Sequence, residues 1–87
     1  MEVAYTKKAQ HDLLHWKLSG NKIIQSKISQ LISAIESNPY IGIGKPEQLK
    51  HELTGKWSRR INAEHRIIYE VINSKIVIHS LKGHYVL

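Results

Sequence analysis

The sequence of 87 residues contains no cysteine and no phenylalanine. The absence of cysteine excludes both a disulfide framework and a thiolate metal site. No stretch is long and apolar enough to span a bilayer, and the first residues, MEVAYTKK, lack the apolar run of a signal peptide. No internal repeat, low-complexity segment or linker is visible. We therefore expect one soluble, cytoplasmic domain over residues 1–87, without membrane association.

Acidic residues are also scarce, with 7 Asp and Glu against 13 Lys and Arg, which gives a formal net charge of +6. This balance favours an anionic partner, with nucleic acid ahead of an acidic membrane surface or an acidic protein. Charge alone does not choose among them. The basic residues are concentrated between residues 45 and 69, where all three arginines lie close together: Arg59, Arg60 and Arg66.

The first half of the chain predicts two helices after a short strand at Glu2–Tyr5. Thr6 is a suitable N-cap for a helix that runs to about Leu18, and Gly20 and Asn21 are placed to end it and to cap the next one. The apolar stripe predicted for the first helix is Ala9, Leu13 and Trp16, widened by Leu14 and Leu18. That of the second is Ile24, Ile28, Leu31 and Ile35, and Asn38-Pro39 ends this helix.

The second half alternates between apolar and polar residues, which is typical of strands. After a loop at 39–48, strands are expected at Leu49–Leu53, Trp57–Asn62, Arg66–Ile72 and Lys75–Leu81. The unbroken run Ile76–Ile78 indicates a central strand buried on both faces. The predicted fold class is α+β. An N-terminal helical hairpin packs on one face of a mainly antiparallel, twisted sheet of four to five strands, and the other face is open and basic.

Several other motifs point to structure rather than chemistry. Gly42-x-Gly44 lacks the following helix and the spacing of a phosphate-binding loop. His11 and His15 have metal-compatible spacing but no third ligand, so we expect a solvated helix face. The two tryptophans are expected in the core. The remaining central histidines are expected to be structural or exposed: His51, His65 and His79.

One constellation suits the cleavage of RNA without a metal. This reaction needs a base for the 2′-OH proton, cations for the phosphorane, and an acid for the departing 5′ oxygen. Glu47 can serve as the base and His84 as the acid. The cations would be Lys50, Arg60 and Arg66, with further RNA-binding charge from Lys45 and Lys82. Spacing alone favours a plain RNA- or DNA-binding surface over this catalytic interpretation.

The order GKPEQLKHELTGKWSRRINAEHRIIY, followed by KGHY, closely resembles the YoeB (Txe) family of bacterial toxins, which belong to the RelE-like mRNA interferases. The resemblance covers essentially the whole chain. It implies a ribosome-dependent endoribonuclease that cuts mRNA in the A site without a metal or cofactor and leaves a cyclic phosphate. It also implies an acidic antitoxin of the YefM/Axe type, and repression of the operon when the pair binds operator DNA. A homodimer is a further option.

Carried over residue by residue, the resemblance implies Glu47 as the general base, Arg66 as the transition-state arginine and His84 as the general acid. Tyr85 would orient the substrate, and Lys50 and Arg60 would contact the RNA. The chain departs from the family at Lys82, where an arginine is common, and in carrying Val86 and Leu87 after the tyrosine. The alternative function is a catalytically silent basic module that acts only with its antitoxin on DNA.

Overall fold

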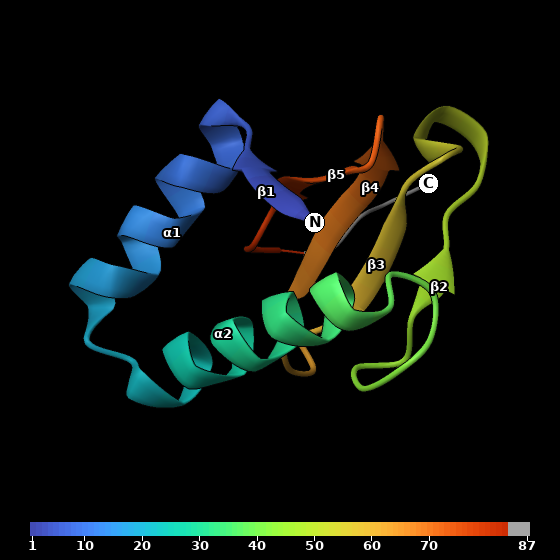
Figure 1. Ribbon diagram of the computed structural model, residues 1–87. Helices are drawn as coiled ribbons and strands as arrows, with labels where there is room; N and C mark the ends of the chain where they lie inside the picture. The colour runs from blue at the N-terminus through green and yellow to red at the C-terminus, as the bar shows by residue number, and fades with distance from the viewer. Residues whose placement is uncertain (84–87) are drawn as a thin grey trace.

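The computed structural model describes residues 1–83, so the predictions for His84, Tyr85 and the Val86-Leu87 extension lie outside the described residues. Two helices cover one face of a five-stranded sheet with the strand order β1-β5-β4-β3-β2 (Figure 1). This confirms the predicted α+β architecture. The elements are β1 (Glu2–Tyr5), α1 (Lys7–Ser19), α2 (Lys22–Ser37), β2 (Glu47–Gln48), the 3-10 helix η1 (His51–Leu53), β3 (Trp57–Arg60), β4 (Arg66–Ile72) and β5 (Lys75–Ser80).

The two helices begin and end where their capping residues predict. The Thr6 hydroxyl accepts a hydrogen bond from the backbone N–H of Ala9, at 3.2 Å, and so satisfies a donor of the first turn of α1. Gly20 ends α1 in the left-handed conformation, with φ of 71°. The Asn21 side chain then accepts from the N–H of Ile24 at the start of α2, at 3.1 Å.

The buried stripe of α1 differs from the predicted one. Leu13 is 39% exposed, Leu14 51% and Leu18 77%, whereas the carboxylate-bearing Asp12 is only 4% exposed. The helix therefore presents Asp12 to the sheet, together with two predicted core residues, Ala9 and Trp16. The predictions for Leu13, Leu14 and Leu18 were wrong because helical spacing identifies a face but not which residues along that face have something to pack against.

The core lies between the helices and the sheet and follows the predicted stripe of α2. Its members share near-complete burial and come from α1, α2, the strands and the two segments beyond β3 and β5: Ala9, Trp16, Ile24, Ile28, Leu31, Ile35, Ile61, Ile67, Tyr69, Ile76, Ile78 and Leu81. Trp57 packs against this cluster and is partly buried. The prediction that the two tryptophans are core residues is thus confirmed.

The sheet is mixed, because β1 pairs parallel with β5 while the other pairs are antiparallel. β4 has the predicted bounds and is the central strand. β5 lies between two strands, but Val77 is only partly buried, so the expected burial on both faces is incomplete. Asn73 and Ser74 connect β4 to β5 with φ of 50° and 63°.

The strand predicted at Leu49–Leu53 is wrong. The second strand is the two-residue β2, Glu47–Gln48, and the chain then forms η1. His51 has φ of 57°, which an extended strand cannot accommodate. The N–H of Leu53 donates to the carbonyl of Lys50 and that of Thr54 to the carbonyl of His51, both at 3.1 Å. Local hydrogen bonds therefore replace a longer ladder with β3.

The predicted strand Trp57–Asn62 ends earlier, at Arg60. The N–H groups of Ile61 and Asn62 both donate to the carbonyl of His65, so the chain turns at this point. The Asn62 side chain tightens the turn by accepting from the N–H groups of Glu64 and His65. This turn returns the chain at once to β4.

Candidate active site

The sheet register brings several predicted site residues onto the face that points away from the helices. Glu47 of β2 pairs with Ser58 of β3, and Ser58 pairs with Ile68 of β4. One row further, Arg60 pairs with Arg66. Alternation along the strands puts all five on the same face, since Ile67 and Tyr69 between them belong to the core.

Within this face, Glu47 and Arg66 form an ion pair with Oε2 and Nη1 3.8 Å apart. The Arg66 side chain is only 16% exposed, whereas that of Glu47 is 55% exposed. The guanidinium is therefore held largely inside the surface, while the carboxylate can meet a ligand from solvent. The two residues come from strands that are not neighbours, because β3 lies between them.

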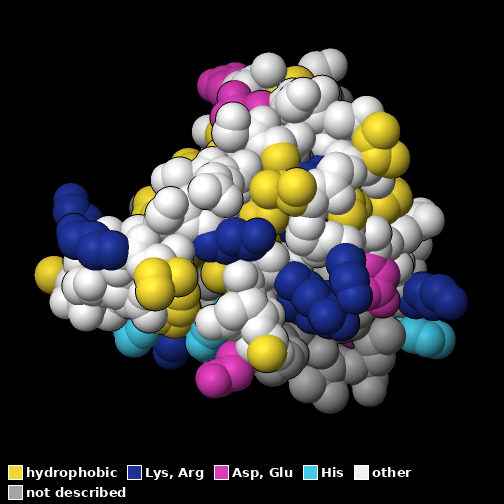
Figure 2. All heavy atoms as spheres, turned by 90° about the horizontal axis from the view of Figure 1, so that it is seen from below, with side chains coloured by type: hydrophobic (Ala, Val, Ile, Leu, Met, Phe, Trp, Pro, Cys, Tyr) yellow, Lys and Arg dark blue, Asp and Glu magenta, His cyan; other side chains and the backbone are white. Residues whose placement is uncertain are grey.

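Other cations flank this pair. Arg60 is exposed, and its backbone N–H donates to the carbonyl of Gly44 at 2.7 Å, which ties β3 to the loop before β2. Lys45 and Lys50 lie on either side of β2 and are both exposed. Figure 2, which shows the molecule from below, has Lys and Arg side chains gathered in one area with acidic side chains next to them. Exposed cations thus flank the Glu47–Arg66 pair, but Ser58, Ile68 and Leu49 are buried, so this face is less open than was predicted.

The segment after β5 runs back toward Arg66. The backbone N–H of Arg66 donates to the carbonyl of Gly83 at 3.0 Å, and the N–H of Gly83 donates to Nδ1 of His65 at 2.9 Å. Lys82 is exposed next to these bonds. The described chain therefore approaches the Glu47–Arg66 pair at the residue before His84. His84 and Tyr85 themselves lie outside the described residues, and their roles stay predictions.

Arg59 has a different role from its neighbour Arg60. It is fully buried, and its guanidinium donates to the Tyr69 hydroxyl and to three carbonyls of the loop that leads to β2: Asn38, Ile41 and Ile43. The Tyr69 hydroxyl in turn donates to the carbonyl of Pro39 at 2.6 Å. Burial raises the pKa of Tyr69, and the hydrogen bond and charge of Arg59 act in the opposite direction.

Sequence reasoning missed two polar residues that support this site, Ser58 and Asp12. Ser58 is fully buried beside Glu47 in the register, and its hydroxyl has no hydrogen-bond partner within residues 1–83. Asp12 is buried against the end of β5, and its place between Ala9 and Trp16 at helical spacing was a signal for it. His65 was predicted to be structural or exposed, and its bond to Gly83 makes it structural.

Two further predictions concern metals and membranes. His11 and His15 are both exposed. Within residues 1–83, no three His, Asp or Glu side chains lie close enough together to hold a metal ion. No helix in the described part of the chain is long and apolar enough to cross a membrane.

Comparison with known proteins gives consistent matches. A sequence model described as "YoeB-like toxin of bacterial type II toxin-antitoxin system" matches residues 5–85. The chain is 45% identical to Toxin YoeB of Synechocystis over 85 residues, 98% of each chain. It is 39% identical to Toxin YoeB of Escherichia coli, covering 98% of this chain and 100% of the relative.

Solved structures show the same fold. The YoeB/ParE toxin from Agrobacterium tumefaciens superimposes with a TM-score of 0.93 at 36% identity, covering 98% of this chain and 100% of that one. A YoeB-YefM complex and a YoeB dimer, both from Staphylococcus aureus, give TM-scores of 0.87 at 42% and 41% identity, each over 98% of both chains. With this fold and a family match over nearly its whole length, the chain belongs to the YoeB-like toxins of bacterial type II toxin–antitoxin systems.

Proposed function

We propose that this protein is a ribosome-dependent endoribonuclease that cleaves mRNA in the A site by metal-free general acid–base catalysis and so inhibits translation. The observation that carries the proposal is the exposed carboxylate of Glu47, 3.8 Å from the largely buried guanidinium of Arg66 on a basic sheet face. Attack of the 2′ oxygen on the adjacent phosphorus requires a base for the 2′-OH proton and a cation that holds the phosphate. A carboxylate beside a fixed guanidinium provides both.

In the proposed reaction, Glu47 takes the proton of the 2′-OH, and the 2′ oxygen attacks the adjacent phosphorus. The guanidinium groups of Arg66 and Arg60 stabilise the charge that develops on the phosphoryl oxygens. The bond from phosphorus to the 5′ oxygen then breaks, and His84 donates a proton to that oxygen. The products are a 2′,3′-cyclic phosphate and a free 5′-hydroxyl, so protons and bonds balance without a metal.

The remaining site residues would bind the RNA rather than move protons. The exposed ammonium groups of Lys45, Lys50 and Lys82 can neutralise backbone phosphates around the scissile bond. Tyr85 would stack on or orient the nucleotide whose phosphate is attacked.

The direct test is cleavage in a purified translation system, with the cut mapped by primer extension relative to the A site. Glu47→Ala and His84→Ala are expected to lower the single-turnover rate by about a hundredfold or more, the usual range for acid–base groups. Ribosome binding should survive because the cations are untouched. Glu52→Ala, an exposed acid of η1, is the matched control and should cleave normally. An intact mRNA with the unsubstituted protein would overturn the proposal and favour a silent binding module.

We also infer that a cognate antitoxin with an acidic segment neutralises the protein, and that the complex binds operator DNA. The net charge of +6 and the Staphylococcus aureus YoeB-YefM complex support this partner. The dimer from the same organism supports a homodimer as a second assembly. Antitoxin affinity should fall as salt is raised from about 0.05 to 0.5 M, because the contacts are electrostatic. Salt-independent affinity would instead indicate a mainly apolar interface on the helices.

A further inference from the structure

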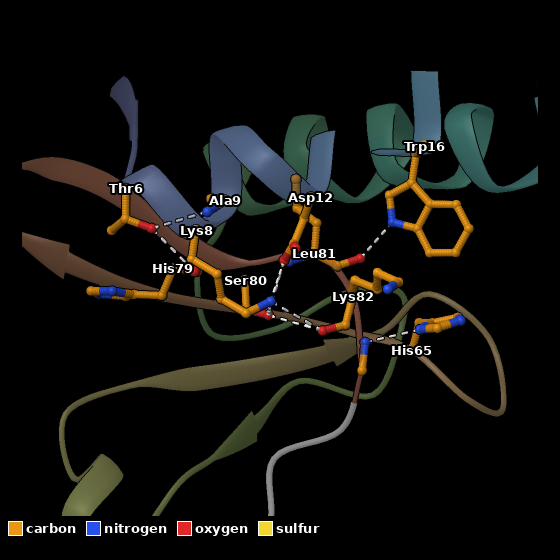
Figure 3. Close-up of polar contacts among 11 residues, drawn as sticks. Thr6, Lys8, Ala9, Asp12, Trp16, His65, His79, Ser80, Leu81 and Lys82 are labelled. Carbon is orange, nitrogen blue, oxygen red and sulfur yellow. Dashed lines mark hydrogen bonds and ion pairs between the residues drawn. The ribbon is translucent and has the colours of Figure 1, made fainter. Parts of the chain in front are cut away.

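The last residue of β5 and the three residues after it are held by side chains from two distant parts of the chain. Figure 3 shows Asp12 and Trp16 of α1 pointing at residues 80–82, and His65 of the turn before β4 lying near the far end of these residues. The four residues, Ser80, Leu81, Lys82 and Gly83, directly precede His84 in the sequence. We refer to them as the 80–83 segment.

Side-chain anchors are needed here because the strand ladder ends. Pairing between β4 and β5 stops at Ile68 and Ser80, next to a register shift between Ile68 and Tyr69. Leu81 is fully buried one residue later, so its backbone groups have no access to water. The carboxylate of Asp12, itself 4% exposed, accepts from the N–H of Leu81 at 3.0 Å.

Trp16 completes the attachment to α1. Its indole Nε1–H donates to the carbonyl of Leu81 at 2.8 Å, and this bond is buried. The two helix residues thus hold both backbone polar groups of one residue, the N–H and the carbonyl. Asp12 also lies within 3.4 Å of the Ser80 hydroxyl and pairs with the ammonium of Lys8.

The far end of the 80–83 segment is fixed by the turn that carries Arg66. Gly83 donates its N–H to His65 Nδ1, and its carbonyl accepts from the N–H of Arg66. The His65 ring lies edge-on to the Trp16 ring, with centroids 4.9 Å apart. Trp16, which holds Leu81, and His65, which holds Gly83, are therefore in contact with each other.

We propose that Asp12 and Trp16 are positioning residues that act through His84. They fix the 80–83 segment against α1 and beside Arg66. In this way they set the position of Gly83, the residue that precedes the general acid, relative to the Glu47–Arg66 pair. This inference rests on the proposed function for the role of His84. The attachment of the segment itself is independent of that function.

Loss of the anchors should slow the chemical step without weakening ribosome binding. Asp12→Ala removes the acceptor for Leu81 and is expected to lower the single-turnover rate at saturating ribosomes by about 10- to 100-fold, the cost of a misplaced catalytic group. Asp12→Asn keeps an acceptor oxygen and should recover most of the rate. Trp16→Phe keeps a ring but removes the donor to Leu81, and provides a second variant in case Asp12→Ala unfolds. His11→Ala, an exposed substitution on the same helix, is the matched control.

A double-mutant cycle with His84→Ala separates positioning from general loss of structure. If Asp12 and Trp16 act through His84, then Asp12→Ala or Trp16→Phe costs nothing further once His84 is removed. If the losses multiply in the double variants, with all melting temperatures above the assay temperature, the positioning role is overturned.

Amide hydrogen exchange gives a readout that does not depend on cleavage. In Asp12→Ala and Trp16→Phe, the N–H groups of Leu81 and Gly83 should exchange at least tenfold faster, while those of Ile67 and Ile76 in the core stay unchanged. Unchanged exchange at Leu81 and Gly83 would overturn the attachment. If the unsubstituted protein fails to cut mRNA, the proposed nuclease function falls, and these exchange rates still decide whether the two residues hold the segment.

Discussion

Arg59 donates its Nε–H to the hydroxyl of Tyr69, at 3.1 Å, inside the protein. Arg59 belongs to β3 and Tyr69 to β4, and both side chains lie on the helix side of the sheet. The Arg59 guanidinium is 5.9 Å from the centre of the Tyr69 ring. Together they donate hydrogen bonds to the carbonyls of four loop residues: Asn38, Pro39, Ile41 and Ile43. Because this loop leads directly into β2, the same contacts fix the approach to Glu47.

Replacing Arg59 with Lys is expected to lower the free energy of unfolding by about 3 kcal/mol, because an ammonium cannot reproduce the fork and leaves buried carbonyls without donors. Urea unfolding measures this change. Arg60→Lys on the exposed neighbour is the control and should change stability by less than about 0.5 kcal/mol. Equal losses at the two positions would mean that the loop is not held by Arg59.

Stability should depend on the ionisation of Tyr69 at alkaline pH. Burial raises its pKa above the ordinary value of 10.0, despite the opposing effect of Arg59. As the pH rises above about 10, Tyr69 loses its phenolic proton in the unfolded chain before it does so in the native protein. The unfolded state then binds fewer protons, and the free energy of unfolding falls as pH rises.

Tyr69→Phe cannot ionise, so the stability advantage of the unsubstituted protein over this variant should shrink as pH rises above about 10, the ordinary pKa of a tyrosine. Tyr5, whose pKa is also raised by burial and then by Glu36, is present in both proteins and cancels. Denaturant unfolding at each pH gives the difference. A constant difference would show that Tyr69 does not lose its proton more easily in the unfolded chain.

Gly44 and Gly55 offer a comparison of backbone strain with and without crowding. Both have positive φ, at 85° and 93°. A Cβ at Gly44 would lie 2.7 Å from Leu31 Cδ2 and 3.1 Å from Arg59 Cβ, whereas a Cβ at Gly55 would meet nothing within 4 Å. We expect Gly44→Ala to cost about 3 kcal/mol and Gly55→Ala about 1 kcal/mol, measured by thermal unfolding. Similar costs would place the strain in the backbone alone.

The arginines on the open face should differ from Arg59 in their effect on cleavage. Arg66→Lys is expected to lower the single-turnover rate by about a hundredfold, since a point charge does not replace a fork aimed at a phosphate, and to leave stability nearly unchanged. Arg60→Ala should slow cleavage with little loss of stability. If Arg59→Lys slows cleavage as much as Arg66→Lys at a temperature where both are folded, the assignment of faces along β3 fails.

Much of the fold could be read from local sequence. The caps at Thr6, Gly20 and Asn21 act within one helical turn, and the alternation of Arg66–Ile72 defines β4 with the bounds that were predicted. These signals work because capping and side-chain direction depend on near neighbours along the chain. The family motifs also named the site residues that the register then brought to one face, although their chemical roles remain predictions.

Tertiary structure decided what local patterns leave open. Alternation along the strand already puts Arg59 and Arg60 on opposite faces, but only the assembled core and the carbonyls of the 38–43 loop make Arg59 a fully buried residue. Asp12 is likewise buried because its carboxylate accepts a hydrogen bond from the N–H of Leu81, just after β5. The Glu47–Arg66 pair forms because the two-residue strand β2 pairs with β3 and so brings Glu47 near β4. Burial and strand pairing are competitions among distant segments, so their outcome is set by the assembled molecule and not by any stretch of sequence alone.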